Sequence, residues 1–110
     1  MQTYRVKITQ QAQEQMIDIA DYIQNELLAP RAAIDTMSAL RSSIKSLSSM
    51  PGRIQLTEEE PWHSEGIRRM VVQNFYVYFW IDEDRKIIQV IAVVYARRDQ
   101  MRFLQSLSRE

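Results

Sequence analysis

Arginines and polar aromatic rings gather in one stretch of the chain, residues 66–99. An arginine carries a fixed positive charge that can hold a phosphate group, and an aromatic ring can stack on a nucleic-acid base. This combination is typical of surfaces that bind RNA strands. The candidate site residues are therefore Arg68, Arg69, Tyr76, Tyr78, Trp80, Tyr95, Arg97 and Arg98.

Part of this set could also cleave RNA. When the 2′-hydroxyl of RNA attacks the neighbouring phosphate, a base must take its proton, a positive charge must stabilise the phosphate, and an acid must protonate the leaving oxygen. An arginine suits the second role, and a tyrosine could move protons if neighbouring arginines lowered its pKa. The alternative is that a partner protein or the C-terminal segment covers the rings. The catalytic candidates are Arg68, Arg69, Tyr95 and Arg97, and the substrate-binding candidates are Tyr76, Tyr78, Trp80 and Arg98.

Alternating side chains predict that residues 66–99 form three antiparallel strands, because successive residues of a strand face opposite sides of the sheet. On the middle strand the pattern predicts a core face of Phe75, Val77, Phe79 and Ile81, opposite Tyr76, Tyr78 and Trp80. On the last strand it predicts one face of Ile88, Val90, Ala92 and Val94, and another of Gln89, Ile91, Val93, Tyr95 and Arg97. We therefore expect one binding surface, made of Tyr76, Tyr78, Trp80, Tyr95 and Arg97.

Before this sheet the sequence predicts a strand and two helices. Residues 3–8 alternate as a half-buried strand does. Thr9 suits the N-cap of a helix that runs to about Leu28, and Pro30 suits the first turn of a second helix, which Pro51-Gly52 ends. The short connection makes the helices an antiparallel hairpin, and the apolar spacing in residues 101–107 predicts a short C-terminal helix. We expect an α+β fold in one domain, residues 1–110.

Charge is balanced over the whole chain but uneven along it. Lys plus Arg and Asp plus Glu each number 14, so net charge does not predict binding to nucleic acid or membrane. Residues 57–66 carry only acidic charges, and we expect Trp62 to anchor this loop to the domain. The chain has no cysteine, and His63 has no possible metal ligands at a suitable spacing, so we expect no metal and no cofactor. No segment has the pattern of a signal peptide or membrane span, which favours a cytoplasmic protein.

The order of these elements resembles the RelE/ParE superfamily of bacterial toxins from type II toxin-antitoxin modules. Three segments carry the resemblance, which covers nearly the whole chain: YRVKITQQAQEQMIDIADYI, IRRMVVQNFYVYFWID and IIQVIAVVYARRD. The resemblance implies a microbial-ribonuclease-like fold and a cognate antitoxin that neutralises the toxin. It implies one of two activities. RelE-like members cut mRNA on the ribosome without a metal, whereas ParE-like members poison DNA gyrase.

The match to the RelE pattern is partial. Under the resemblance, Arg97 falls where the family has a functional arginine, and Arg68 or Arg69 falls near its basic residues on an earlier strand. Tyr76 stands where an arginine is expected, and Phe103 stands where a tyrosine is expected. Phenylalanine cannot transfer a proton, which favours a growth-inhibiting ParE-like toxin. The alternatives are a ribosome-dependent endoribonuclease and a degenerate module that only binds the antitoxin. We expect the antitoxin to lie against the helical hairpin or the open sheet face.

Overall fold

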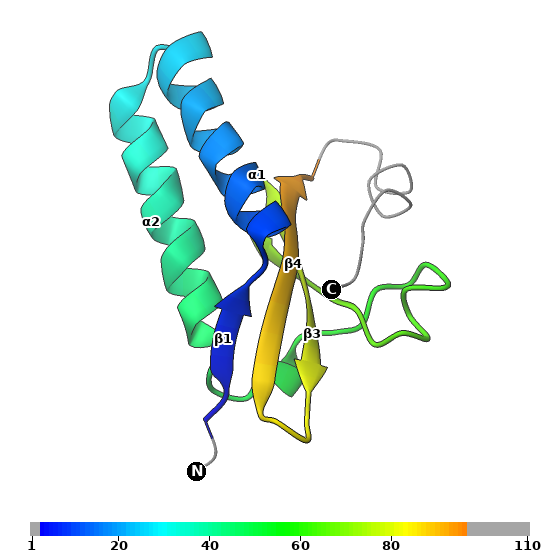
Figure 1. Ribbon diagram of the computed structural model, residues 1–110. Coiled ribbons are helices and arrows are strands. Elements are labelled where there is room, and N and C mark those ends of the chain that lie inside the picture. Colours follow the sequence, from blue (N-terminus) through cyan, green and yellow to red (C-terminus); the bar gives the residue numbers. More distant parts are fainter. Residues whose placement is uncertain (1–2, 97–110) are drawn as a thin grey trace.

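The computed structural model describes residues 3–96 (Figure 1). In chain order its elements are β1 (Arg5–Ile8), α1 (Gln10–Asp21), the π-helical turn η1 (Tyr22–Glu26), α2 (Pro30–Ser46), the 3-10 turn η2 (Pro51–Arg53), β2 (Arg68–Val72), β3 (Phe75–Asp82) and β4 (Ile87–Tyr95). The predicted α+β class and the order of these elements are confirmed. The predicted C-terminal helix lies outside the described residues.

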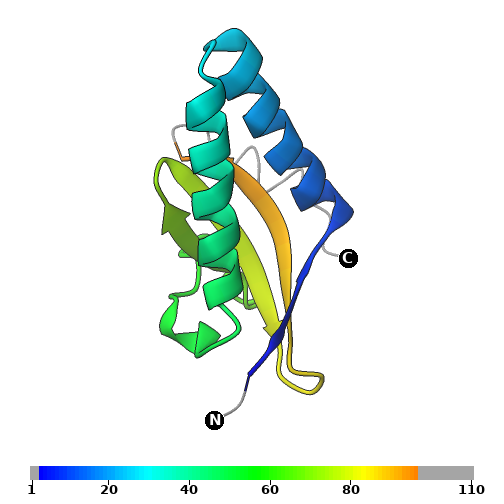
Figure 2. The ribbon, with the colours of Figure 1, turned by 90° about the vertical axis from the view of Figure 1, so that its left-hand side faces the viewer.

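Both helices begin at the residues that the sequence predicts. Thr9 Oγ1 accepts a hydrogen bond from the backbone N–H of Ala12 at 3.2 Å, which satisfies a donor that the first turn of α1 leaves without a helical partner. Pro30 opens α2, where its missing N–H costs no hydrogen bond. Between the helices the chain turns at Leu28, whose φ of 52° lies in the left-handed region. The helices form the predicted antiparallel hairpin (Figure 2).

The strands form one sheet in the order β1-β4-β3-β2. β2, β3 and β4 make the predicted antiparallel meander, whose first turn falls at Gln73 and Asn74. β1 pairs with β4 in parallel. The N-terminal strand and β2 are therefore the two edges of the sheet, and β4 has a hydrogen-bonded neighbour on each side.

The two faces of the sheet pack against different parts of the chain (Figure 1). The helical hairpin covers one face, and the main core lies between them, with Met16, Ile19, Leu40, Ile44, Phe75, Val77, Phe79, Ile88 and Val90 among its buried residues. On the opposite face Trp62 packs against a second buried cluster, as its predicted anchoring role requires. We call this second cluster the outer cluster; its buried members are Ile67, Tyr78, Ile91, Ala92 and Val94.

A β-bulge in β4 interrupts the alternation of its side chains. The register pairs Tyr78 with Ala92 and the next residue, Phe79, with Val90, so Ile91 is an extra residue without a partner on β3. A bulge of one residue exchanges the two faces for every residue beyond it. The prediction of two continuous faces along this strand is therefore wrong.

After the bulge, each residue of β4 lies on the opposite face of the sheet from the one predicted. Val93 lies in the main core and Tyr95 packs against that core. Ala92 and Val94, which we expected to share a face with Val90, belong to the outer cluster instead. Tyr95 consequently packs on the helix side of the sheet. On β3, which has no extra residue, the predicted separation of the two faces is confirmed.

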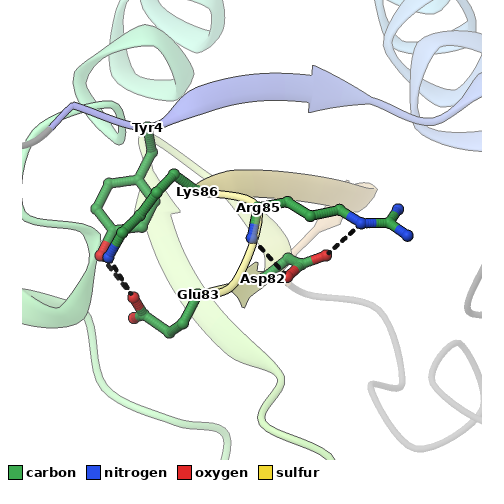
Figure 3. Close-up of polar contacts among 5 residues, drawn as sticks. All are labelled: Tyr4, Asp82, Glu83, Arg85 and Lys86. Atoms are coloured by element: carbon green, nitrogen blue, oxygen red, sulfur yellow. Dashed lines mark hydrogen bonds and ion pairs between the residues drawn. The ribbon is translucent and has the colours of Figure 1, made fainter.

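The start of the chain is tied to the turn between β3 and β4 (Figure 3). The Tyr4 hydroxyl donates a hydrogen bond to Glu83 Oε1 at 2.8 Å, and Lys86 Nζ lies 3.2 Å from the same oxygen. Lys86 Nζ also lies 5.1 Å from the centroid of the Tyr4 ring, within the range of a cation–π interaction. The Tyr4 hydrogen bond, and after it the Lys86 hydrogen bond, lowers the pKa of the Glu83 carboxyl below its ordinary value of 4.5.

We predict that Tyr4→Phe lowers the free energy of unfolding at neutral pH and that this loss shrinks in acid. The folded-state pKa of Glu83 is depressed, so its contribution to stability is present above 4.5 and is lost as the pH falls through the folded-state pKa. Urea unfolding of both proteins near neutral pH and in acid measures the difference. Tyr22→Phe, which alters an exposed ring on the hairpin, is the matched control. An equal loss for Tyr4→Phe at both pH values would contradict this account.

Candidate functional site

The three aromatic candidates of β3 all point away from the helices, but they differ in exposure. Tyr76 and Trp80 are half-buried and pack at the margin of the outer cluster. Tyr78, between them, has only 1% of its surface exposed. A nucleic-acid base or a partner side chain can stack only on an accessible ring. Of these three candidates, Tyr76 and Trp80 are therefore the rings that offer such a surface.

Arg69 of β2 lies over one of these rings. Its guanidinium carbon is 4.4 Å from the centroid of the Tyr76 ring, which is a cation–π arrangement. The Tyr76 ring lies 6.2 Å from the Tyr78 ring at an interplanar angle of 72°, so the two rings meet edge to face. The stack places a positive charge and an aromatic surface side by side on the outer face of the sheet. Such a pair can bind an anionic or aromatic group of a partner.

The environment of Tyr78 opposes a role in proton transfer. Burial raises the pKa of its hydroxyl above the ordinary value of 10.0, and the Arg69 guanidinium beside it offsets this rise only in part. Glu59, on the loop that precedes β2, adds to the rise. A tyrosine that acts as a base near neutral pH needs a lowered pKa instead. Tyr78 is therefore unsuited to the proton-transfer chemistry considered from the sequence.

Arg68 forms a structural contact. Its Nη1 donates a hydrogen bond to the backbone carbonyl of Ile54, and a β-bridge joins its backbone to Leu56. These contacts hold the segment after η2 against the edge strand β2. Of the two adjacent arginines, only Arg69 joins the aromatic rings of the outer face.

Tyr95 lies on the other side of the sheet from these rings. Its ring centroid is 4.6 Å from that of Phe75 and 6.4 Å from that of Tyr22, which belongs to the helical hairpin. The expected surface that joins Tyr95 to Tyr76 and its neighbours is therefore not formed. The physical reason is the extra residue Ile91, which turns every later side chain of β4 to the opposite face.

The remaining candidates, Arg97 and Arg98, lie outside the described residues, as does Phe103. Their roles stay predictions. His63 is exposed, and its Nδ1 lies 2.8 Å from the backbone carbonyl oxygen of Thr57. This contact joins two residues of the same acidic loop. Within residues 3–96, no three His, Asp or Glu side chains are grouped so that they could hold a metal ion. In the same part of the chain, no helix has the length and apolar character needed to cross a membrane.

Two cationic residues that were not predicted as site residues lie close together in the structure. Arg41 and Lys45 both lie at the rim of a groove between α2 and β1. Residues four apart share one face of a helix, so their proximity to each other was readable from the sequence. The position of β1 beside that face was not readable, because it depends on the parallel pairing of β1 with β4.

Comparison with known proteins identifies the family. The model of a family described as the ParE toxin of the type II toxin-antitoxin system, parDE, matches residues 6–100 of the chain. No match to a curated protein was found. Among solved structures, the chromosomal ParDE toxin-antitoxin system from P. aeruginosa is similar with a TM-score of 0.71 and 19% identity, over 86% of this chain and 98% of that chain.

Two further structures show the same fold. The E. coli toxin RelE in the free state, a double arginine-to-alanine mutant, has a TM-score of 0.63 and 10% identity over 92% of each chain. The RelBE2 toxin-antitoxin complex from Mycobacterium tuberculosis has a TM-score of 0.60 and 16% identity, over 84% of this chain and 98% of that chain. At these identities the structures establish a RelE/ParE-like fold alone. Because the family model spans most of its length, the chain belongs to the ParE family of toxins of type II toxin-antitoxin systems.

Proposed function

We propose that this toxin inhibits bacterial growth by binding DNA gyrase and that a cognate antitoxin neutralises it. The observation that carries the choice of target is the division of the candidate residues between the two faces of the sheet. Metal-free RNA cleavage needs a base, a stabilising charge and an acid within reach of one phosphate. Among the described candidates, Arg69 lies on the outer face and Tyr95 lies on the helix side. This division favours a binding mode of action over a nuclease.

The outer face suits contact with a protein target. Arginine and aromatic residues are enriched at the centres of protein interfaces, where rigid rings supply contact area and guanidinium groups supply directed hydrogen bonds. Arg69, Tyr76 and Trp80 are all half-buried on this face, where Arg69 lies over the Tyr76 ring and Trp80 lies beyond Tyr78. Their packing against the outer cluster limits their conformational freedom before any partner binds. We propose this group as the contact site for the target.

The surface of the helical hairpin suits a second protein. Ile17 of α1, Leu28 of the connecting turn and Ile34 of α2 expose 58%, 81% and 67% of their surfaces. Exposed apolar side chains can serve as contacts for a partner protein. The similar M. tuberculosis structure is a toxin-antitoxin complex. By analogy we propose that an antitoxin covers part of the hairpin.

Assays of both targets with one preparation test the proposal. Purified protein is expected to inhibit DNA supercoiling by gyrase and to trap gyrase cleavage complexes. It is expected to leave mRNA intact on translating ribosomes, as read by primer extension. Discrete mRNA cuts that disappear in Arg97→Ala, with normal supercoiling, would instead establish the endoribonuclease. Inactivity in both assays, with unchanged growth after induced expression, would leave only a module that binds the antitoxin.

Tyr95→Phe is expected to keep growth inhibition within about twofold of the unaltered toxin. The ring of Tyr95 packs against Phe75 and Tyr22, and phenylalanine preserves that packing. If the Tyr95 hydroxyl moved a proton during RNA cleavage, its removal would cost about 100-fold or more in rate. Growth curves after induced expression, with equal protein levels checked on a gel, separate these results. A loss of toxicity in a variant that unfolds at the same urea concentration as the parent would contradict the proposal.

A further inference from the structure

The acidic loop, residues 57–66, lies on the side of the sheet away from the helical hairpin (Figure 1). Its Trp62 packs against the outer cluster, which includes Tyr78. Burial raises the pKa of the Tyr78 hydroxyl, and the nearby carboxylate of Glu59 raises this pKa further. The buried middle ring of β3 therefore lies next to two side chains of the acidic loop.

Hydrogen bonds within the acidic loop give it a shape of its own. The N–H groups of His63, Glu65 and Gly66 donate to the carbonyls of Glu59, Pro61 and His63, at 2.8, 3.1 and 3.1 Å. Because these bonds join residues of the loop to one another, they are kept if the loop moves as one body. Gly66, at the end of the loop, has a φ of 81°, which glycine adopts without strain.

The two ends of the acidic loop lie side by side. The N–H of Thr57 donates to the carbonyl of Ile67 at 2.8 Å, and the N–H of Ile67 donates to the carbonyl of Trp62 at 3.0 Å. A compact loop with adjacent ends can turn about its base through small changes of φ and ψ at a few residues. The half-buried side chain of Trp62 then attaches the loop to the outer cluster.

Two polar side-chain atoms of the acidic loop are buried at an energetic cost. Thr57 Oγ1 and Glu59 Oε1 are both buried, and neither has a hydrogen-bond partner within residues 3–96. A buried polar atom without a partner destabilises the arrangement that buries it. The apolar contact of Trp62 thus favours the observed position of the loop, whereas these two oxygens oppose it. This opposition lowers the free energy needed to move the loop away from the sheet.

Movement of the acidic loop would complete a row of rings on β3. Tyr76, Tyr78 and Trp80 are alternate residues of one strand, so their side chains face the same side of the sheet. Tyr78 has only 1% of its surface exposed, whereas the rings on either side of it are half-buried. Aromatic rings are favoured at the centres of protein interfaces. An uncovered Tyr78 would join its two neighbours in one continuous contact surface.

We propose that the acidic loop is an autoinhibitory cover. It hides Tyr78 in the free toxin and moves aside when the outer face meets its protein target. The closed loop lowers the apparent affinity for that target, because only the fraction of molecules with an open loop is competent to bind through all three rings. The inference rests on the proposed function only in naming gyrase as the target.

Hydroxyl-radical footprinting read by mass spectrometry tests whether the loop covers Tyr78. Trp62→Ala removes the side chain that attaches the loop, so we expect Tyr78 of the full-length protein to be oxidised at least about fivefold faster than in the parent. Tyr22, with 47% of its surface exposed on the hairpin, should react equally in both proteins. Phe79, which is buried in the main core, should stay protected and thereby show that the variant is folded. A protected Tyr78 in this variant would overturn the inference.

Thr57→Val tests the opposite change. Valine has nearly the shape of threonine but lacks the buried hydroxyl, so the closed position of the loop should become more stable. We expect Tyr78 to be oxidised about threefold more slowly than in the parent, because the loop opens less often. An unchanged or faster oxidation of Tyr78 would contradict the proposed cover, and this result does not depend on whether Trp62→Ala folds.

Inhibition of DNA supercoiling by gyrase tests whether the cover is autoinhibitory. Trp62→Ala should reach half inhibition at about threefold lower toxin concentration than the parent, and Thr57→Val at about threefold higher concentration. Glu58→Gln, at an exposed position of the same loop, is the matched control and should act as the parent does. Weaker inhibition by Trp62→Ala would overturn the autoinhibitory role. If the parent does not inhibit gyrase, the proposed function fails, while the footprint still decides whether the loop covers Tyr78.

Discussion

β4 determines where the other parts of this protein lie. It pairs with β1 in parallel and with β3 in antiparallel orientation, and nearly all of its side chains are buried on one face or the other. Because both faces of this strand carry packed layers, the extra residue Ile91 decides which layer each later side chain joins. Val93 thereby completes the core beneath the helices, and Val94 completes the outer cluster. Because β4 is buried on both faces, its pairing register is strongly specified. A shift of one residue would move each of its apolar side chains to the opposite face of the sheet.

The bulge also separates Tyr95 from the aromatic residues of β3, with which the sequence pattern predicts one shared surface. The outer face carries a guanidinium stacked on a ring, Arg69 on Tyr76, and the half-buried Trp80 farther along β3. The helix side holds Tyr95 in an aromatic contact with the hairpin. The arrangement therefore places the ring of Tyr95 and the aromatic group of the outer face on opposite sides of the sheet.

Much of the fold could be predicted from local patterns. Thr9 and Pro30 mark their helices because capping depends on neighbouring residues alone, and the alternation in residues 75–81 marks β3 because no extra residue interrupts it. The candidate site was predicted less well. A bulge leaves no signal in a run of apolar residues, so the side on which Tyr95 lies was not readable. The burial of Tyr78 and the hydrogen bond from Arg68 to Ile54 depend on how the segment between α2 and β2 packs, which no periodic pattern encodes.

The central claim is that the bulge at Ile91 places Tyr95 on the helix side, apart from the outer aromatic group. Nuclear Overhauser contacts of the Tyr95 ring in the isotope-labelled protein test it most directly. The account predicts contacts from that ring to the rings of Tyr22 and Phe75, whose centroids lie 6.4 Å and 4.6 Å away, and none to Tyr76 or Trp80. Contacts from Tyr95 to Tyr76 or Trp80, without contacts to Tyr22, would contradict it.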